Sequence, residues 1–65
     1  MKKKKLSQRE QEIYKLLIDG KSRKDIMDKL CIAKSTLDLH IVHIFRKKSV
    51  KNRLELIARH YEVAK

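Results

Sequence analysis

Hydrophobic residues recur at helical spacing in four separate stretches of this chain. Within each stretch they return every three or four positions, which places them on one side of an α-helix. No stretch shows the alternation of a β-strand, and no repeat or linker is visible. The four apolar stripes are Ile13, Leu16 and Leu17; Ile26, Met27 and Leu30; Leu37, Ile41, Ile44 and Phe45; and Leu54, Ile57, Ala58 and Tyr61. The pattern predicts an all-α fold, a four-helix bundle.

Polar residues at the ends of these stretches set the helix limits. Ser7 followed by Glu10 is a capping box and Gly20 is a left-handed stop, so the first helix is predicted over about 8–19. Similar starting signals precede the second and fourth helices: Ser22 with Asp25, and Asn52 with Glu55.

The second and third helices are separated by only Cys31, Ile32 and Ala33, without Gly or Pro. So short a joint fixes the angle between two helices, as in a helix-turn-helix that seats its second helix in the DNA major groove. The third helix is expected to end near Lys48. Ala33 lacks a capping oxygen, so its start should be weaker by about 1 kcal/mol unless Ser35 substitutes.

Length and composition exclude several classes of function. A chain of 65 residues is one small domain with no room for a large active-site cavity, so we predict neither an enzyme nor a cofactor. The single Cys31 excludes an internal disulfide and favours the reducing cytoplasm. No apolar run reaches the length of a membrane span or follows the basic start as in a signal peptide, so a soluble, cytoplasmic protein is expected.

The net charge of +10 is spread unevenly. Residues 6–20 carry three acidic and two basic side chains, whereas every other stretch is basic. This distribution predicts a polyphosphate-binding surface with a supporting helix behind it, the alternative being general solubility. Residues 1–5 form a basic arm before the domain at 6–65; it either follows the minor groove of DNA or is a disordered solubilising tail.

The third helix has a second side opposite its apolar stripe. At about 100° per residue that side carries Thr36 and His43 alongside a central row, with Asp38 on its border. The central row consists of Ser35, Leu39, Val42 and Arg46. We expect this face to look into a DNA groove; the alternative is that another element buries Leu39 and Val42.

These residues resemble the LuxR-type (NarL- or GerE-type) DNA-binding domain of bacterial transcription regulators, in one ungapped register from about Leu6 to Ala58. The resemblance rests on three motifs. The opening motif is Leu6-Ser7-Gln8-Arg9-Glu10 with Glu12-Ile13, and the closing motif is Lys47, Val50 and Asn52-Arg53. The middle motif consists of Gly20, Ser22, Lys24-Asp25-Ile26, Leu30, Ile32, Thr36-Leu37, His40 and Ile44. It implies a four-helix fold whose third helix reads DNA and whose fourth dimerises, often at the end of a longer regulator.

The chain departs from the family pattern where DNA would be read. Asp38 stands where the family has a Lys or Arg that contacts DNA, so that contact cannot be carried over to it. An acid there repels phosphate, although it can accept a hydrogen bond from cytosine N4. Met27 replaces a small Ala between the second and third helices.

The sequence therefore predicts that different residues contact the bases and the phosphates of double-stranded DNA. Base edges would be met by Ser35, Asp38, Leu39 and Val42, the two apolar side chains favouring thymine methyls, and Arg46 would alternatively reach a guanine. Phosphates would be held by Lys24, Lys34, Arg46, Lys47, Lys51 and Arg53. Six phosphate contacts imply that log affinity falls with log salt at a slope near −5.

On the fourth helix, Leu56, His60 and Val63 lie opposite the apolar stripe, and we predict that this narrow strip forms a homodimer interface. The alternative is that they are scattered exposed apolar residues without a partner.

Other functions have less support. His40 and His43, which would have to share a metal with Cys31, point to different sides of the third helix's apolar stripe. No metal site is therefore predicted, and His40 is expected to pack against a neighbouring helix. The main rival to DNA binding is a degenerate helix-turn-helix that binds another regulator or RNA polymerase, with Asp38 facing a basic partner. A membrane-surface peptide is disfavoured because folding consumes the apolar stripes.

Overall fold

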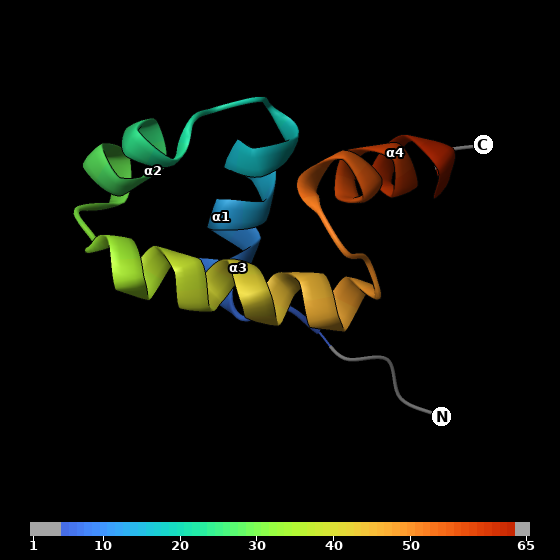
Figure 1. Ribbon diagram of the computed structural model, residues 1–65, viewed down its shortest axis with the longest axis horizontal. Coiled ribbons are helices and arrows are strands. Elements are labelled where there is room, and N and C mark those ends of the chain that lie inside the picture. The colour runs from blue at the N-terminus through green and yellow to red at the C-terminus, as the bar shows by residue number, and fades with distance from the viewer. Residues whose placement is uncertain (1–4, 64–65) are drawn as a thin grey trace.

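The computed structural model describes residues 5–63, which form four α-helices and no strand. They are α1 (Gln8–Ile18), α2 (Arg23–Leu30), α3 (Lys34–Lys48) and α4 (Arg53–Val63), so the predicted all-α class and order of helices are confirmed. Both α1 and α2 pack on α3, and α4 packs on α1 (Figure 1). Figure 1 shows α3 running along one side of the molecule, with α2 and α4 at opposite ends of the other side. Residues 1–4 of the predicted basic arm lie outside the described residues.

The predicted caps hold the starts of three helices. Ser7 Oγ accepts a hydrogen bond from the Glu10 backbone N–H (3.2 Å), and Glu10 Oε1 accepts one from the Ser7 N–H (2.9 Å), which completes the capping box of α1. Gly20 follows α1 with φ of 86°, in the left-handed region as predicted. The other two caps are also present: Ser22 Oγ accepts from the Asp25 N–H, and Asn52 Oδ1 accepts from the Glu55 N–H.

The joint between α2 and α3 turns through a left-handed residue. Cys31 has φ of 56° and ψ of 48°, a conformation that costs a residue with a Cβ roughly 1 kcal/mol. This conformation ends α2 tightly, because the Ile32 N–H then donates to the Met27 carbonyl at 3.2 Å. Ala33 begins α3 with an extended backbone and, as expected from its side chain, supplies no cap.

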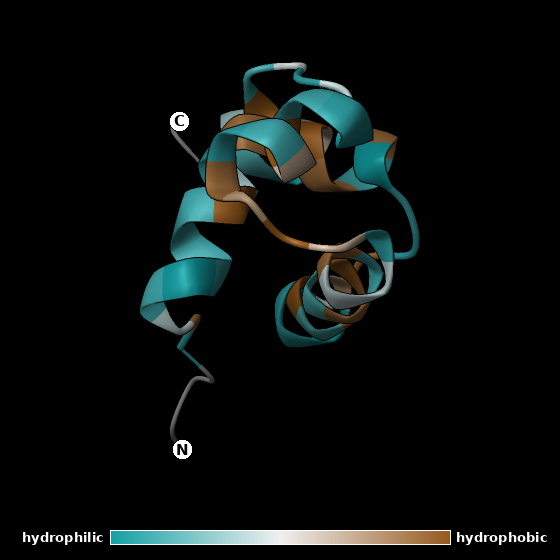
Figure 2. Ribbon diagram, turned by 90° about the vertical axis from the view of Figure 1, so that its left-hand side faces the viewer, coloured by the Kyte–Doolittle hydropathy of each residue, from teal (hydrophilic) through white to brown (hydrophobic). Residues whose placement is uncertain are grey.

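Every helix contributes to one hydrophobic core. Its fully buried side chains are Ile13 and Leu17 of α1, Ile26 of α2, Leu37 and Ile44 of α3, and Leu56 of α4. Figure 2, a view from the N-terminal end of α3, shows that this helix has a hydrophobic and a hydrophilic side. No helix in the described part of the chain is both long and apolar enough to cross a membrane.

The buried side of α4 is not the one predicted. Leu56 is only 1% exposed and packs in the core, whereas Leu54 and Tyr61, assigned to the apolar stripe, are 80% and 62% exposed. Of that stripe, Ile57 is half-buried and Ala58 is exposed. The helix is therefore rotated about its axis relative to the prediction: where α4 packs on the rest of the chain, the side that carries Leu56 faces the core.

Candidate nucleic-acid interface

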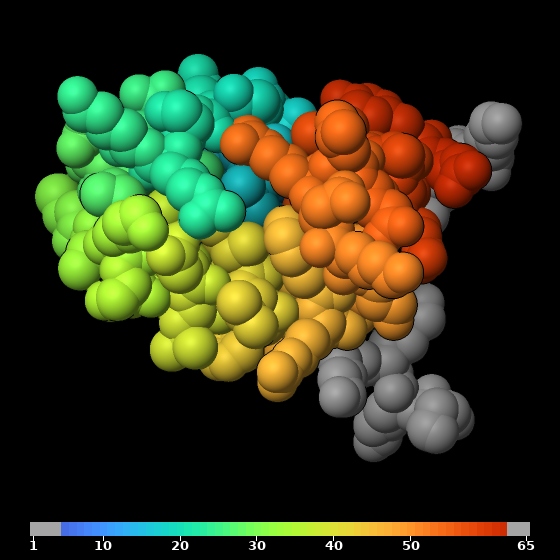
Figure 3. Space-filling view, in the orientation of Figure 1, coloured from blue at the N-terminus to red at the C-terminus, as the bar shows by residue number. Residues whose placement is uncertain are grey.

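The outer face of α3 is uncovered. Its central row consists of Ser35, Leu39, Val42 and Arg46, all exposed, opposite the buried Leu37, Ile41 and Ile44. The two apolar members, Leu39 and Val42, are 56% and 44% exposed, so no described element buries them. In Figure 3 the atoms of α3 form the lower edge of the molecule. The helix thus presents a mixed polar and apolar face to the surroundings.

One flank of this face is fixed to α1 by an ion-pair cluster around Glu10. Lys47 Nζ lies 2.7 Å from Glu10 Oε1, and His43 Nδ1 lies 3.6 Å from Oε2. The Glu10 side chain is almost fully buried. The hydrogen bond from Lys47, followed by that from the Ser7 N–H, lowers the pKa of this carboxyl below its ordinary value, and burial opposes them without prevailing. Glu10 is therefore a charged link between α1 and α3.

Lys47 was predicted to bind a phosphate, but in the structure it forms an ion pair with Glu10. Its ammonium donates to Glu10 Oε1 and to the Lys5 carbonyl (3.3 Å), and its side chain is mostly covered. Taking it to DNA would leave the nearly buried Glu10 carboxylate without its main partner, which is unfavourable. We therefore remove Lys47 from the candidate phosphate ligands.

The other flank of the outer face is joined to α2 through Asp38. Arg23 Nη1 lies 2.7 Å from Asp38 Oδ1, and Lys34 Nζ lies 3.3 Å from Oδ2. Each oxygen of the carboxylate thus accepts from a different cation. Asp38 was predicted to meet a base edge, but its carboxylate is engaged with these two residues. Arg23 was not among the predicted site residues, because a partner fifteen positions away leaves no local spacing signal.

Arg53, another predicted phosphate ligand, also has a structural partner. Its guanidinium donates to the Leu17 carbonyl from Nε (3.2 Å) and Nη2 (3.0 Å), and also to the Lys21 carbonyl. Leu17 lies in the last turn of α1, where carbonyls lack partners within the helix. Arg53 therefore ties the end of α1 to the start of α4 and is also removed from the phosphate ligands.

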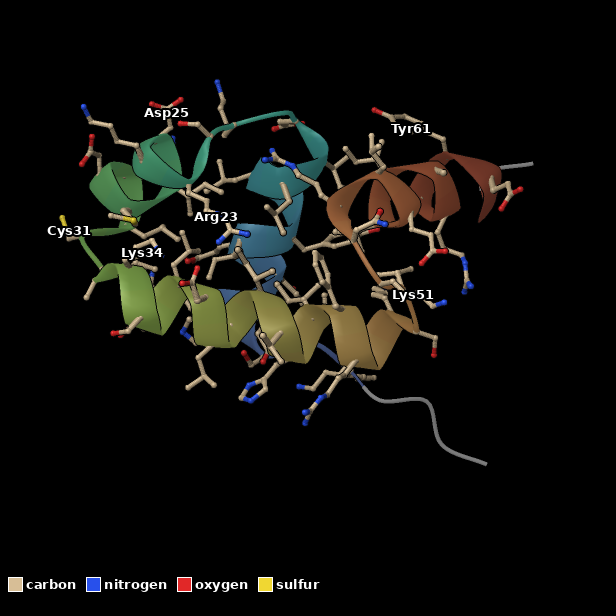
Figure 4. All side chains as sticks on the ribbon, in the orientation of Figure 1. Arg23, Asp25, Cys31, Lys34, Lys51 and Tyr61 are labelled. Carbon is tan, nitrogen blue, oxygen red and sulfur yellow. The ribbon has the colours of Figure 1, made fainter. Side chains whose placement is uncertain are left out.

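The other predicted phosphate ligands remain exposed on the surface: Lys24, Lys34, Arg46 and Lys51. Among them only Lys34 forms an ion pair within residues 5–63, the exposed one with Asp38. Lys51, labelled in Figure 4, lies at the turn between α3 and α4. These four cations and the central row of α3 form the candidate interface.

The predicted dimer strip on α4 is wrong at its central residue. Leu56 is in the core of the single chain and is not available to a partner. His60 is exposed but faces α1, where its Nδ1 forms a 2.8 Å hydrogen bond with the Tyr14 hydroxyl. The side chain of Val63 lies outside the described part of the structure. The packing of α4 on α1 therefore occupies the surface that the prediction assigned to a second subunit.

Within residues 5–63, no three His, Cys, Asp or Glu side chains come together as metal ligands would. His40 is half-buried, and its buried Nδ1 has no hydrogen-bond partner among the described residues.

Comparison with known proteins identifies the family of this chain. The family model of bacterial regulatory proteins of the luxR family matches residues 4–60. The transcriptional regulatory protein DesR of Bacillus subtilis is 42% identical over 57 residues, which are 88% of this chain and 29% of DesR. The oxygen regulatory protein NreC of Staphylococcus epidermidis is 41% identical over 52 residues, 80% of this chain and 24% of NreC.

A response regulatory protein of Escherichia coli, YgeK, is 38% identical over 52 residues, 80% of this chain and 35% of YgeK. The chain thus spans about a quarter to a third of the length of these relatives. No solved structure matches the chain. The family match covers α1, α2 and α3 and most of α4, so it includes the α2–α3 pair and the uncovered face of α3. This chain belongs to the luxR family of bacterial regulatory proteins.

Proposed function

We propose that this chain binds double-stranded DNA as part of a transcription regulator, with α3 lying in the major groove. The observation that carries the proposal is the outer face of α3, which stays uncovered although both flanks of the helix are tied to neighbouring helices. A helix that is fixed to its neighbours on both flanks and exposed on one face can enter the major groove, which is wide enough to admit an α-helix.

The side chains of the outer face suit base edges of a particular kind. Leu39 and Val42 offer apolar surface, which favours the methyl group of thymine. Ser35, one turn before Leu39, carries a hydroxyl that both donates and accepts. Arg46, at the other end of the row, reaches either a guanine or a phosphate. We expect the preferred site to contain thymines at the centre of the contact.

Four exposed cations are available for phosphates, fewer than the six predicted from the sequence. Lys47 and Arg53 are engaged within the protein, which leaves Lys24, Lys34, Arg46 and Lys51. Because each neutralised phosphate contributes about −0.9 to the salt slope, four contacts give a slope of about −3.6.

Binding of the chain to fluorescent duplexes tests the proposal. Random duplexes measure the phosphate term, and sites selected from a random library measure base reading. We expect Arg46→Gln to weaken binding several-fold, and Val42→Glu to weaken it at least as much by placing an acid on the outer face. The matched control is Lys15→Gln, which removes one charge from the side of α1 opposite Ile13 and Leu17. Equal effects of Arg46→Gln and Lys15→Gln would contradict docking through α3.

The rival function, a protein-interaction module, would use Asp38 to meet a basic partner such as a surface of another regulator or of RNA polymerase. In the structure that carboxylate already accepts from Arg23 and Lys34. The observation that suggested the rival is therefore accounted for within the chain. Absence of binding to any duplex at low salt would revive the rival.

A further inference from the structure

We infer that Arg23 is a further DNA-contacting residue, which binds a backbone phosphate, and that Asp38 is the positioning residue that holds it in place. The inference rests on the proposed docking of α3 in the major groove. It gives a role to the acid at position 38 other than repelling DNA or reading a cytosine.

The geometry of the pair leaves most of the guanidinium free. Arg23 is the first residue of α2, and its Nη1 donates to Asp38 Oδ1 at 2.7 Å across the joint between the helices. Figure 4 shows Arg23 reaching from α2 toward α3. A guanidinium has five N–H donors in a fixed fork, and Asp38 uses one of them. The Arg23 side chain is 55% exposed, so the remaining donors can reach a second acceptor.

The charges around Asp38 favour an anion as that acceptor. Lys34, one turn before Asp38 on α3, places its ammonium 3.3 Å from Oδ2. Two cations share one carboxylate, so the cluster keeps a net charge of +1. A phosphate oxygen approaching it meets an excess of positive charge, although position 38 itself carries an acid.

The position of the cluster points to the DNA backbone rather than to the bases. At 100° per residue, Asp38 lies about 70° around α3 from the centre of the outer face, on the side of α2. When a helix lies in the major groove, its outer face meets the base edges and its flanks meet the sugar-phosphate strands. With α3 docked in this way, the guanidinium of Arg23 would lie beside a sugar-phosphate strand of the DNA. Both oxygens of Asp38 already accept from cations, so a contact with cytosine N4 would have to share an oxygen with one of these ion pairs.

The salt dependence of DNA binding, measured for single and double variants, tests this arrangement. We expect Arg23→Gln to reduce the magnitude of the salt slope by about 0.9, the value of one phosphate contact, and to weaken binding several-fold without changing the selected sequence. Arg23→Lys should keep most of the slope because it keeps the charge. The control is Lys29→Gln, an exposed cation of the same helix for which we propose no contact.

The role of Asp38 is tested by coupling. In the Asp38→Asn background, Arg23 is no longer held by a carboxylate, so the further loss on adding Arg23→Gln should be at least threefold smaller than in the original chain. A pair with a merely structural role would change the melting temperature and leave the salt slope as it is. The melting temperature of each variant therefore separates folding from binding.

Three results would overturn the inference: an unchanged salt slope in Arg23→Gln, equal effects of Arg23→Gln in both backgrounds, or a changed base preference in Asp38→Asn, which would make Asp38 a base reader. Failure of the proposed function differs from these. It would appear as absence of salt-dependent binding in the unmodified chain, whereas failure of the inference alone leaves that binding and the effect of Arg46→Gln intact.

Discussion

Lys47 of α3 donates to the Glu10 carboxylate of α1 at 2.7 Å, and the same Glu10 oxygen accepts from the N–H of Ser7, the N-cap residue of α1. One nearly buried carboxylate thus stabilises the start of the first helix and fixes one flank of the third. This pair engages a lysine of the presumed DNA-binding helix within the protein, so we do not count Lys47 among the phosphate ligands. It also makes the placement of α3 dependent on the ionisation of Glu10.

Because the pKa of Glu10 is lowered in the folded chain, mainly by Lys47, the unfolded chain binds the Glu10 proton more tightly than the folded one. The ionised carboxylate therefore stabilises the fold above the ordinary glutamate pKa, and this contribution is lost as the pH falls through the lower folded value. We expect Glu10→Gln to reduce the free energy of unfolding by about 2 kcal/mol at neutral pH.

Urea unfolding of the unmodified chain and of Glu10→Gln at a series of pH values measures the contribution of the Glu10 charge to stability. The difference between them should shrink as the medium becomes acidic, and a difference independent of pH would contradict the role of the charge. Glu12→Gln removes an exposed carboxylate of the same helix, whose ion pair among residues 5–63 is with Arg9, and should cost less than about 0.5 kcal/mol.

The rotation of α4 predicts opposite outcomes for two leucines two positions apart. Leu56→Ala should cost about 2 to 4 kcal/mol because it leaves a cavity in the core. Leu54→Ala, at an exposed position, should change the free energy of unfolding by less than about 0.5 kcal/mol. Denaturant unfolding of the two variants measures both changes in the free energy of unfolding. A larger decrease for Leu54→Ala than for Leu56→Ala would mean that the side of α4 predicted from the sequence is the buried one.

Two basic residues near the start of α4 should separate stability from DNA binding. Arg53→Gln removes the donors to the Leu17 and Lys21 carbonyls, so it should lower stability by roughly 2 kcal/mol and leave the salt slope of DNA binding unchanged. Lys51→Gln should do the reverse and reduce the slope by about 0.9 with an unchanged melting temperature. Thermal unfolding and salt titration of both variants measure the two effects; a reduced slope in Arg53→Gln would return Arg53 to the phosphate ligands.

The start of α3 offers a stabilising substitution. Ala33 has the extended backbone of an N-cap and no side-chain oxygen to accept an N–H of the first turn. Ala33→Ser supplies that oxygen and should raise the free energy of unfolding by about 1 kcal/mol, visible as a higher melting temperature. Ala33→Val, which adds bulk without an oxygen, is the control. No gain from Ser over Val would mean that this helix start is already satisfied.

Signals close together in the sequence predicted much of this fold. The Ser7–Glu10 and Asn52–Glu55 caps, the stop at Gly20 and the stripes of α1, α2 and α3 are all local patterns, and the structure contains them. The exposure of Leu39 and Val42 followed from the same periodicity.

The face of α4 was missed because this helix has apolar residues on two sides. Leu54 and Tyr61 mark one side and Leu56 the other, so the periodicity alone does not say which one meets α1. The roles of Arg53 and Arg23 were missed for another reason. Their partners Leu17 and Asp38 are 36 and 15 positions away, and such pairs are set by tertiary packing rather than by local spacing.

The most direct test of the central claim, that the outer face of α3 and the cations around it bind DNA, is the affinity for duplex DNA measured across salt concentrations. We expect log affinity to fall with log salt at a slope between about −3.6 and −4.5, for four phosphate contacts or for five with Arg23, and we expect Arg46→Gln to reduce its magnitude by about 0.9. An affinity that does not change with salt, or an unmodified chain that binds no duplex at low salt, would contradict the account.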